Sequence, residues 1–93
     1  MTIKELIEKL KTESDKKVKE GEKANGTHAL LEYWYKNMWN CKDYKTMRIY
    51  DDRIFGILIG LSGAYFITES EFNDLEKETR EYSDKCLKKI HGL

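Results

Sequence analysis

Apolar residues near the N-terminus recur at helical spacing. Ile3, Leu6, Leu10 and Val18 fall on one narrow arc of a helix, with mostly polar residues between them. Thr2 and Glu5 stand three residues apart at the start of this stripe, which is the capping-box signature of a helix N-terminus. After Leu10, Val18 is the only large apolar residue in this stripe. We therefore expect a charged N-terminal helix within residues 1–24 whose second half is exposed, frayed, or ordered only by a partner.

A second amphipathic helix is predicted for residues 28–41. Asn25 and Gly26 mark a break before it, and Thr27 stands where a helix cap belongs. Its apolar arc consists of Leu30, Leu31, Trp34, Tyr35, Met38 and Cys41. Tyr33 points away from this arc and Trp39 lies at its edge, so these two rings fit a core less well.

The middle of the chain is rich in β-branched and aromatic residues, which favour strands. We expect strands at residues 46–50, 53–59 and 64–67, with Asp51 and Asp52 as a two-residue turn and residues 60–63 as the next turn. Gly56, Gly60 and Gly63 are then interpreted as positions of sheet curvature or of close backbone approach. The alternative is a buried helix at residues 52–62. Its glycines count against it, at about 1 kcal/mol each relative to alanine.

The C-terminal segment carries the clearest helix signals. Thr68 and Glu71 form a second capping box, and Ile67 and Phe72 flank it as a hydrophobic staple. Residues 1–93 are thus predicted to form one small α+β domain. Its order is ααβββα, with a three-stranded antiparallel sheet packed against helices. An all-α fold is the alternative.

Composition narrows the class of protein. The 93 residues include 17 lysines and arginines and 17 aspartates and glutamates, and this balance makes direct nucleic-acid binding an unfavoured hypothesis. Two cysteines are too few for a disulfide framework, and the N-terminus shows no signal peptide, so we expect a cytoplasmic protein. The apolar run at residues 54–67 is shorter than the roughly 20 residues of a spanning helix, which predicts no membrane association.

No residue pattern indicates catalysis or a bound cofactor. His28, Cys41, Cys86 and His91 are ligand types that zinc uses, but their spacing does not match the close pairs of structural zinc sites. The glycines are not followed by the Lys-Ser/Thr of a phosphate-binding loop. We therefore expect a protein that is not an enzyme and holds neither a metal nor a cofactor.

Aromatic and basic residues cluster between positions 33 and 53. Aromatic rings beside cations are typical of protein-binding hot spots and of pockets that stack a nucleobase. The predicted binding residues are Tyr33, Trp39, Tyr44, Lys45, Arg48 and Arg53.

The leading hypothesis is a small non-catalytic protein that acts by occupying a macromolecular partner, either a host protein or a cognate one. Proline is absent and Lys, Ile, Asn and Tyr are frequent, a usage typical of AT-rich genomes. This usage suggests a phage or mobile-element accessory protein that inhibits a host system. The alternative is a protein that binds a nucleotide-like small ligand. A homodimer is compatible with both hypotheses, with Ser14 and Gly21 of the first helix as its expected contact.

Overall fold

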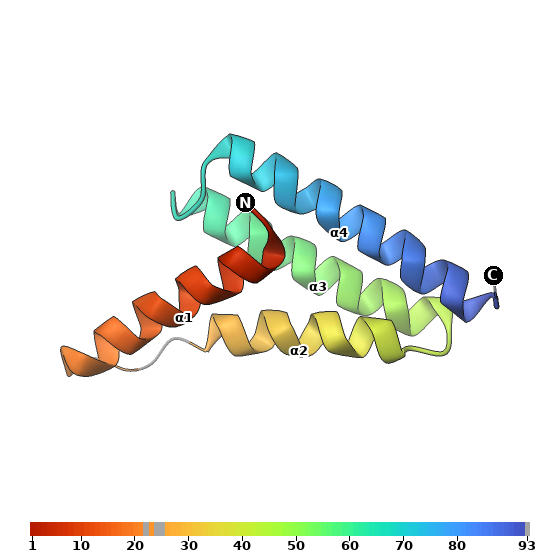
Figure 1. Cartoon of the computed structure of the whole chain (residues 1–93), viewed down its shortest axis with the longest axis horizontal. Helices are drawn as coiled ribbons and strands as arrows, with labels where there is room; N and C mark the ends of the chain where they lie inside the picture. The colour runs from red at the N-terminus through yellow and green to blue at the C-terminus, as the bar shows by residue number, and fades with distance from the viewer. Residues whose placement is uncertain (22, 24–25, 93) are drawn as a thin grey trace.

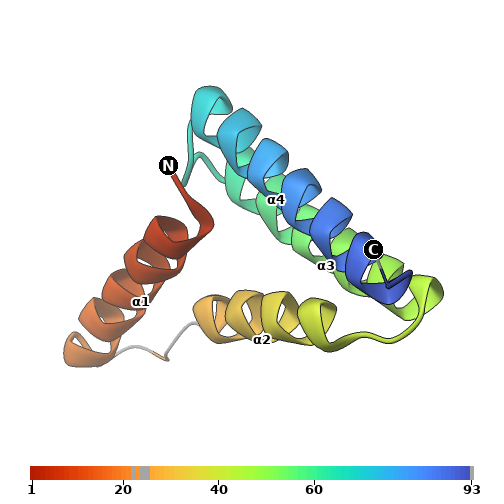
Figure 2. The same ribbon diagram turned by 45° about the vertical axis from the view of Figure 1, so that its right-hand side comes forward.

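The computed structural model describes residues 1–21, 23 and 26–92, and these form four helices (Figure 1). They are α1 (Ile3–Lys19), α2 (Thr27–Asn40), α3 (Tyr44–Gly63) and α4 (Glu69–Ile90). α3 and α4 lie side by side and run antiparallel in both views, while α1 and α2 complete a triangular outline (Figure 2). The molecule is elongated, with principal extents of 48 × 25 × 17 Å.

The predicted α+β class is wrong, and the all-α alternative is confirmed. The expected strands at residues 46–50 and 53–59 and the turn between them all belong to α3, and the part of the chain that the structure describes contains no strand. The expected strand at residues 64–67 is the connection from α3 to α4. Gly56, Gly60 and Gly63 all lie within α3, so the role predicted for them in the curvature of a sheet is wrong as well.

In α3, the burial of one helical face outweighs the preference of its individual residues for strands. Met47, Ile54 and Leu58 are buried, and their spacing of seven and four residues places them on one face of a helix. Asp43 begins the helix, because its carboxylate accepts hydrogen bonds from the Thr46 amide (2.8 Å) and the Thr46 hydroxyl (3.0 Å). Each large buried side chain contributes about 1.5 to 3 kcal/mol, which exceeds the cost of a solvent-facing glycine.

Both predicted capping boxes are present. Thr2 and Glu5 exchange hydrogen bonds of 3.1 Å at the start of α1, and Thr68 and Glu71 exchange bonds of 2.8 and 3.1 Å at the start of α4. The hydrogen bond that the Thr68 amide donates to the Glu71 carboxylate is the main reason why the pKa of Glu71 lies below its usual value. Ile67 is buried beside the second box.

The two N-terminal helices differ from expectation at their facing ends. α1 ends at Lys19, and its last turns are exposed, including Val18. Ser14 is buried, so the expected dimer contact on α1 is covered within the chain itself at that position. α2 begins at Thr27 after an N-cap at Gly26 that makes no side-chain cap. The predicted break at Asn25 lies outside the described residues.

Two tyrosines join α2 to α4 beside the apolar core. The Tyr35 and Thr79 hydroxyls are hydrogen-bonded at 2.8 Å, and the Tyr82 hydroxyl donates to the Tyr35 carbonyl oxygen at 2.9 Å. The two tyrosine rings stack with centroids 4.7 Å apart. Burial raises the pKa of Tyr82 to about 12 and also raises that of Tyr35, so both hydroxyls stay protonated and available as donors. The fully buried apolar side chains are Leu6, Leu31, Met38, Met47, Ile54, Leu58, Leu75 and Cys86.

The first prediction compares two adjacent residues of α3. Leu58 is 0 % exposed and Ile59 is 51 % exposed. We expect Leu58→Ala to lower the free energy of unfolding by about 2 to 5 kcal/mol, because it leaves a cavity in the core. Ile59→Ala is the matched control and should cost less than about 1 kcal/mol. Denaturant titration of both variants checks this, and equal losses would contradict the orientation of α3.

The second prediction concerns a glycine inside α3. An added Cβ at Gly60 meets no atom within 4 Å, and its φ is not positive, so Gly60→Ala should stabilise the fold by about 0.5 to 1 kcal/mol. Gly21 has equal space but a φ of +83°, where alanine is strained. Gly21→Ala should therefore destabilise the protein. Thermal unfolding at low protein concentration measures both shifts, and a loss of stability in Gly60→Ala would contradict a helix at that position.

Candidate functional site

The six predicted binding residues are distributed over different parts of the surface. Tyr33 and Trp39 belong to α2, and the other four, Tyr44, Lys45, Arg48 and Arg53, belong to α3. All six are exposed. Only the pairs that the helices bring together can act on one ligand, so each location is described separately.

Trp39 stands where the C-terminal ends of α2 and α4 meet. Its ring lies 6.1 Å from the Tyr82 ring and 4.4 Å from the Lys89 ammonium. Lys89 also donates a hydrogen bond of 2.8 Å to the Trp39 carbonyl oxygen. These contacts tie α2 to α4, so part of the Trp39 side chain serves the fold.

The Arg53 guanidinium lies near aromatic rings of two helices. It lies 5.8 Å from the Trp34 ring of α2 and 6.0 Å from the Tyr50 ring of α3. Leu30 is one turn from both Tyr33 and Trp34 on α2, and Leu30 and Tyr33 are about half exposed. We call these five residues, Leu30, Tyr33, Trp34, Tyr50 and Arg53, the Arg53 patch.

The charge of Arg53 is not neutralised within the described chain. The ion pairs formed by residues 1–21, 23 and 26–92 join the N-terminal amine to Asp74 at 3.7 Å and Arg80 to Glu76 at 2.6 Å. Arg53 therefore presents its guanidinium on an aromatic surface without a bound carboxylate. Such a guanidinium can pair with an acidic group from outside while its flat face stays stacked.

The binding residues predicted from the sequence include Tyr33 and Arg53. They do not include Trp34, which the helical pattern assigns to the core, or Tyr50. Trp34 and Tyr50 are half-buried, so each packs against the core and also borders the patch. Tyr50 and Arg53 are three residues apart, which places them side by side only on a helix. A helical reading of residues 44–63 was the signal that could have found this pair.

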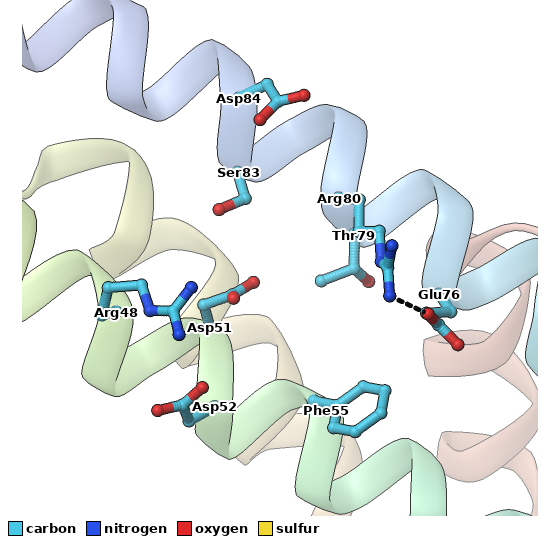
Figure 3. A pocket seen from close by; sticks show the side chains of 9 residues that line it. All are labelled: Arg48, Asp51, Asp52, Phe55, Glu76, Thr79, Arg80, Ser83 and Asp84. Atoms are coloured by element: carbon cyan, nitrogen blue, oxygen red, sulfur yellow. Dashed lines mark ion pairs between the residues drawn. The ribbon is translucent and has the colours of Figure 1, made fainter.

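Arg48 lines a different feature, a groove of about 510 Å³ between α3 and α4 (Figure 3). In Figure 3 the Arg48 guanidinium lies beside Asp51 and Asp52, while Arg80 and Glu76 are paired on the opposite wall. The lining residues are Arg48, Asp51, Asp52, Phe55, Glu76, Thr79, Arg80, Ser83 and Asp84. The groove thus mixes four carboxylates with two guanidinium groups.

Asp51 is the half-buried carboxylate of this groove. Burial raises its pKa, and the neighbouring Asp52 and Asp84 carboxylates raise it further, while Arg48 and Arg80 act in the opposite direction. Burial has the largest effect because it removes water from the ionised form.

The two thiols are poor candidates for nucleophiles. Burial raises the pKa of both Cys41 and Cys86, so each is mainly protonated at neutral pH. Among the described residues, no group of three or more histidine, cysteine, aspartate and glutamate side chains is arranged to hold a metal ion. The same part of the chain has no helix with the length and apolar character needed to cross a bilayer.

Comparison of the chain with protein-family models, with curated proteins and with solved structures gave no match.

The third prediction concerns Asp51 and pH. Because its pKa is raised in the folded state, the folded protein binds the Asp51 proton more tightly than the unfolded chain does. Stability from this group is therefore present below the unfolded pKa of about 4 and is lost as pH rises through the folded pKa.

We expect Asp51→Asn to raise the unfolding temperature at neutral pH, and we expect the gain to disappear below the unfolded pKa. Asp52→Asn, on the exposed side of the same helix turn, is the matched control and should change the unfolding temperature less. Thermal unfolding across the acidic range measures both. A gain for Asp51→Asn that is independent of pH would contradict this explanation.

Proposed function

We propose that this protein is a small non-catalytic binding protein that acts by occupying a macromolecular partner, and that the Arg53 patch makes the contact. The observation that supports this most directly is the Arg53 guanidinium within about 6 Å of the Trp34 and Tyr50 rings and without an ion pair among the described residues, on a surface where the neighbouring residue Tyr33 is half exposed. Tyrosine, tryptophan and arginine are the residue types that most often dominate the energy of protein interfaces.

The chemistry of the patch favours a particular kind of partner. Leu30 and Tyr33 offer apolar area that the chain itself does not cover, and Arg53 offers a fixed positive charge. A complementary surface has an apolar side chain next to an aspartate or glutamate. The guanidinium lies 5.8 and 6.0 Å from the Trp34 and Tyr50 rings, so it can pair with a carboxylate of the partner while it stays beside both rings.

The arrangement of the patch supports rapid and selective binding without large structural change. Trp34 and Tyr50 pack against the core cluster, so the two rings are held in place before the partner arrives. Preorganisation of this kind lowers the entropy lost on binding. The raised pKa values of Cys41 and Cys86 keep both thiols protonated, which is consistent with a role in binding instead of nucleophilic chemistry.

The fourth prediction tests the patch with matched variants. Tagged protein is purified from its native host under non-denaturing conditions, and the partner is identified by mass spectrometry and then titrated against each variant. We expect Tyr33→Ala and Arg53→Ala each to weaken binding by about tenfold or more, equivalent to about 1.4 kcal/mol.

Tyr44→Ala and Arg48→Ala are the controls, because they remove an exposed tyrosine and an arginine that lie outside the patch. They should change affinity by less than about twofold. Unchanged binding by Tyr33→Ala and Arg53→Ala, with the fold intact by circular dichroism, would contradict the assignment of the patch. A small molecule bound in place of any protein partner would contradict the proposed function itself.

A further inference from the structure

The face of α3 that points away from the core carries a regular stripe. Its members are separated alternately by four and three residues, the spacing of a helix that packs along a second helix. They are Lys45, Ile49, Asp52, Gly56, Ile59 and Gly63, and all six are exposed. We call this set the α3 stripe.

The C-terminal half of the α3 stripe, from Gly56 to Gly63, carries no charge, although it faces away from the core. Residues 54–63 contain no charged side chain, yet Ile59 in this segment is 51 % exposed. A Cβ added at Gly56, Gly60 or Gly63 would meet no atom within 4 Å, so nothing in the described chain covers this side of the helix. An amphipathic helix normally places polar residues there.

Beyond its Asp43 cap, α3 carries cations at the end where its own dipole does not favour them. Lys45 and Arg48 stand near the N-terminal end, where the dipole is positive, and the last turn has no basic residue to meet its negative end. A second α3 running antiparallel brings the cations of each copy to the negative end of the other. This charge complementarity favours a second copy of α3 as the partner, and it favours the antiparallel direction.

We propose that the protein forms a symmetric homodimer in which the α3 stripes of two copies pack antiparallel about a twofold axis. The spacing allows one register in which every member of the stripe faces another member. Ile49 then packs against Ile59 of the second copy, and Lys45 lies at the position of its Gly63. Asp52 lies opposite Gly56 of the second copy, where the missing side chain of glycine leaves room for it.

This interface is distinct from the Arg53 patch, whose apolar members Leu30 and Tyr33 lie on α2. The dimer therefore goes beyond the proposed function, and either can fail alone. Gly56 and Gly63 let the two backbones approach closely at the layers that they occupy, and the twofold symmetry is that of the commonest soluble dimers.

The first experiment measures mass by sedimentation equilibrium from micromolar to millimolar concentration. The wild-type chain should reach a dimer mass, and Ile59→Glu should raise the dissociation constant by about thirtyfold or more. Val18→Glu is the matched control, because Val18 is also 51 % exposed but lies on α1, and it should leave the dimer unchanged. Circular dichroism confirms that each variant keeps its helix content.

The second experiment tests direction and register by disulfide trapping in a Cys41→Ser background. Cysteines at positions 49 and 59 of one helix are about 15 Å apart along its axis, too far to join within a chain. In the antiparallel register, the double variant Ile49→Cys/Ile59→Cys forms disulfide-linked dimers on mild oxidation with copper phenanthroline, and each single variant stays largely uncrosslinked.

Three results would overturn the proposal. A monomer mass throughout the concentration range removes the dimer. A dimer that Ile59→Glu leaves intact uses another surface. Efficient trapping by both single variants indicates parallel helices and so contradicts the electrostatic argument. In each of these cases, the Tyr33 and Arg53 variants still test the proposed function separately.

Discussion

The fold depends on α3 burying one face between its two neighbours. Met47, Ile54 and Leu58 on this helix are at most 2 % exposed, and they meet the core side chains of the other helices, such as Leu31 and Leu75. α3 packs against both α2 and α4, and the antiparallel α3–α4 pair is visible in both views (Figures 1 and 2). Any other phase of α3 would expose this apolar set and lose several kcal/mol of burial.

The surfaces proposed for partner binding and for the dimer are consequences of the same helix phase. Once the core side of α3 is set, its α2 flank presents Arg53 to the Trp34 ring and its α4 flank lines the mixed-charge groove with Arg48 and Asp51. The remaining side holds Ile49 and Ile59, which no other part of the described chain buries. A single helix therefore supplies the stacked guanidinium of the proposed partner contact and the apolar stripe of the proposed dimer.

Local signals predicted the starts of α1 and α4 well and the central element poorly. The capping boxes at Thr2 and Thr68 depend on side chains three residues away, so adjacent sequence specifies them completely. In residues 44–63 the isoleucines and tyrosines favour strands as isolated residue types, and the glycines penalise a helix. The deciding term is burial against α2 and α4, which local propensity does not contain. The cluster of rings and cations in the sequence included Tyr33 and Arg53 among the predicted binding residues, whereas the placement of Trp34 and Tyr50 beside Arg53 required the helix phase.

The amino-acid sequence by itself determined the starts of α1 and α4, the balance of charge, and the group of rings and cations from which a contact surface is built. Only the tertiary structure decided that the centre is a helix, that Trp39 packs on Tyr82, and that Arg48 and Arg53 serve different surfaces. The physical reason is that these interactions act over different separations along the chain. Caps and charge patterns act within a few residues, whereas burial and ring stacking depend on which distant segments share a core.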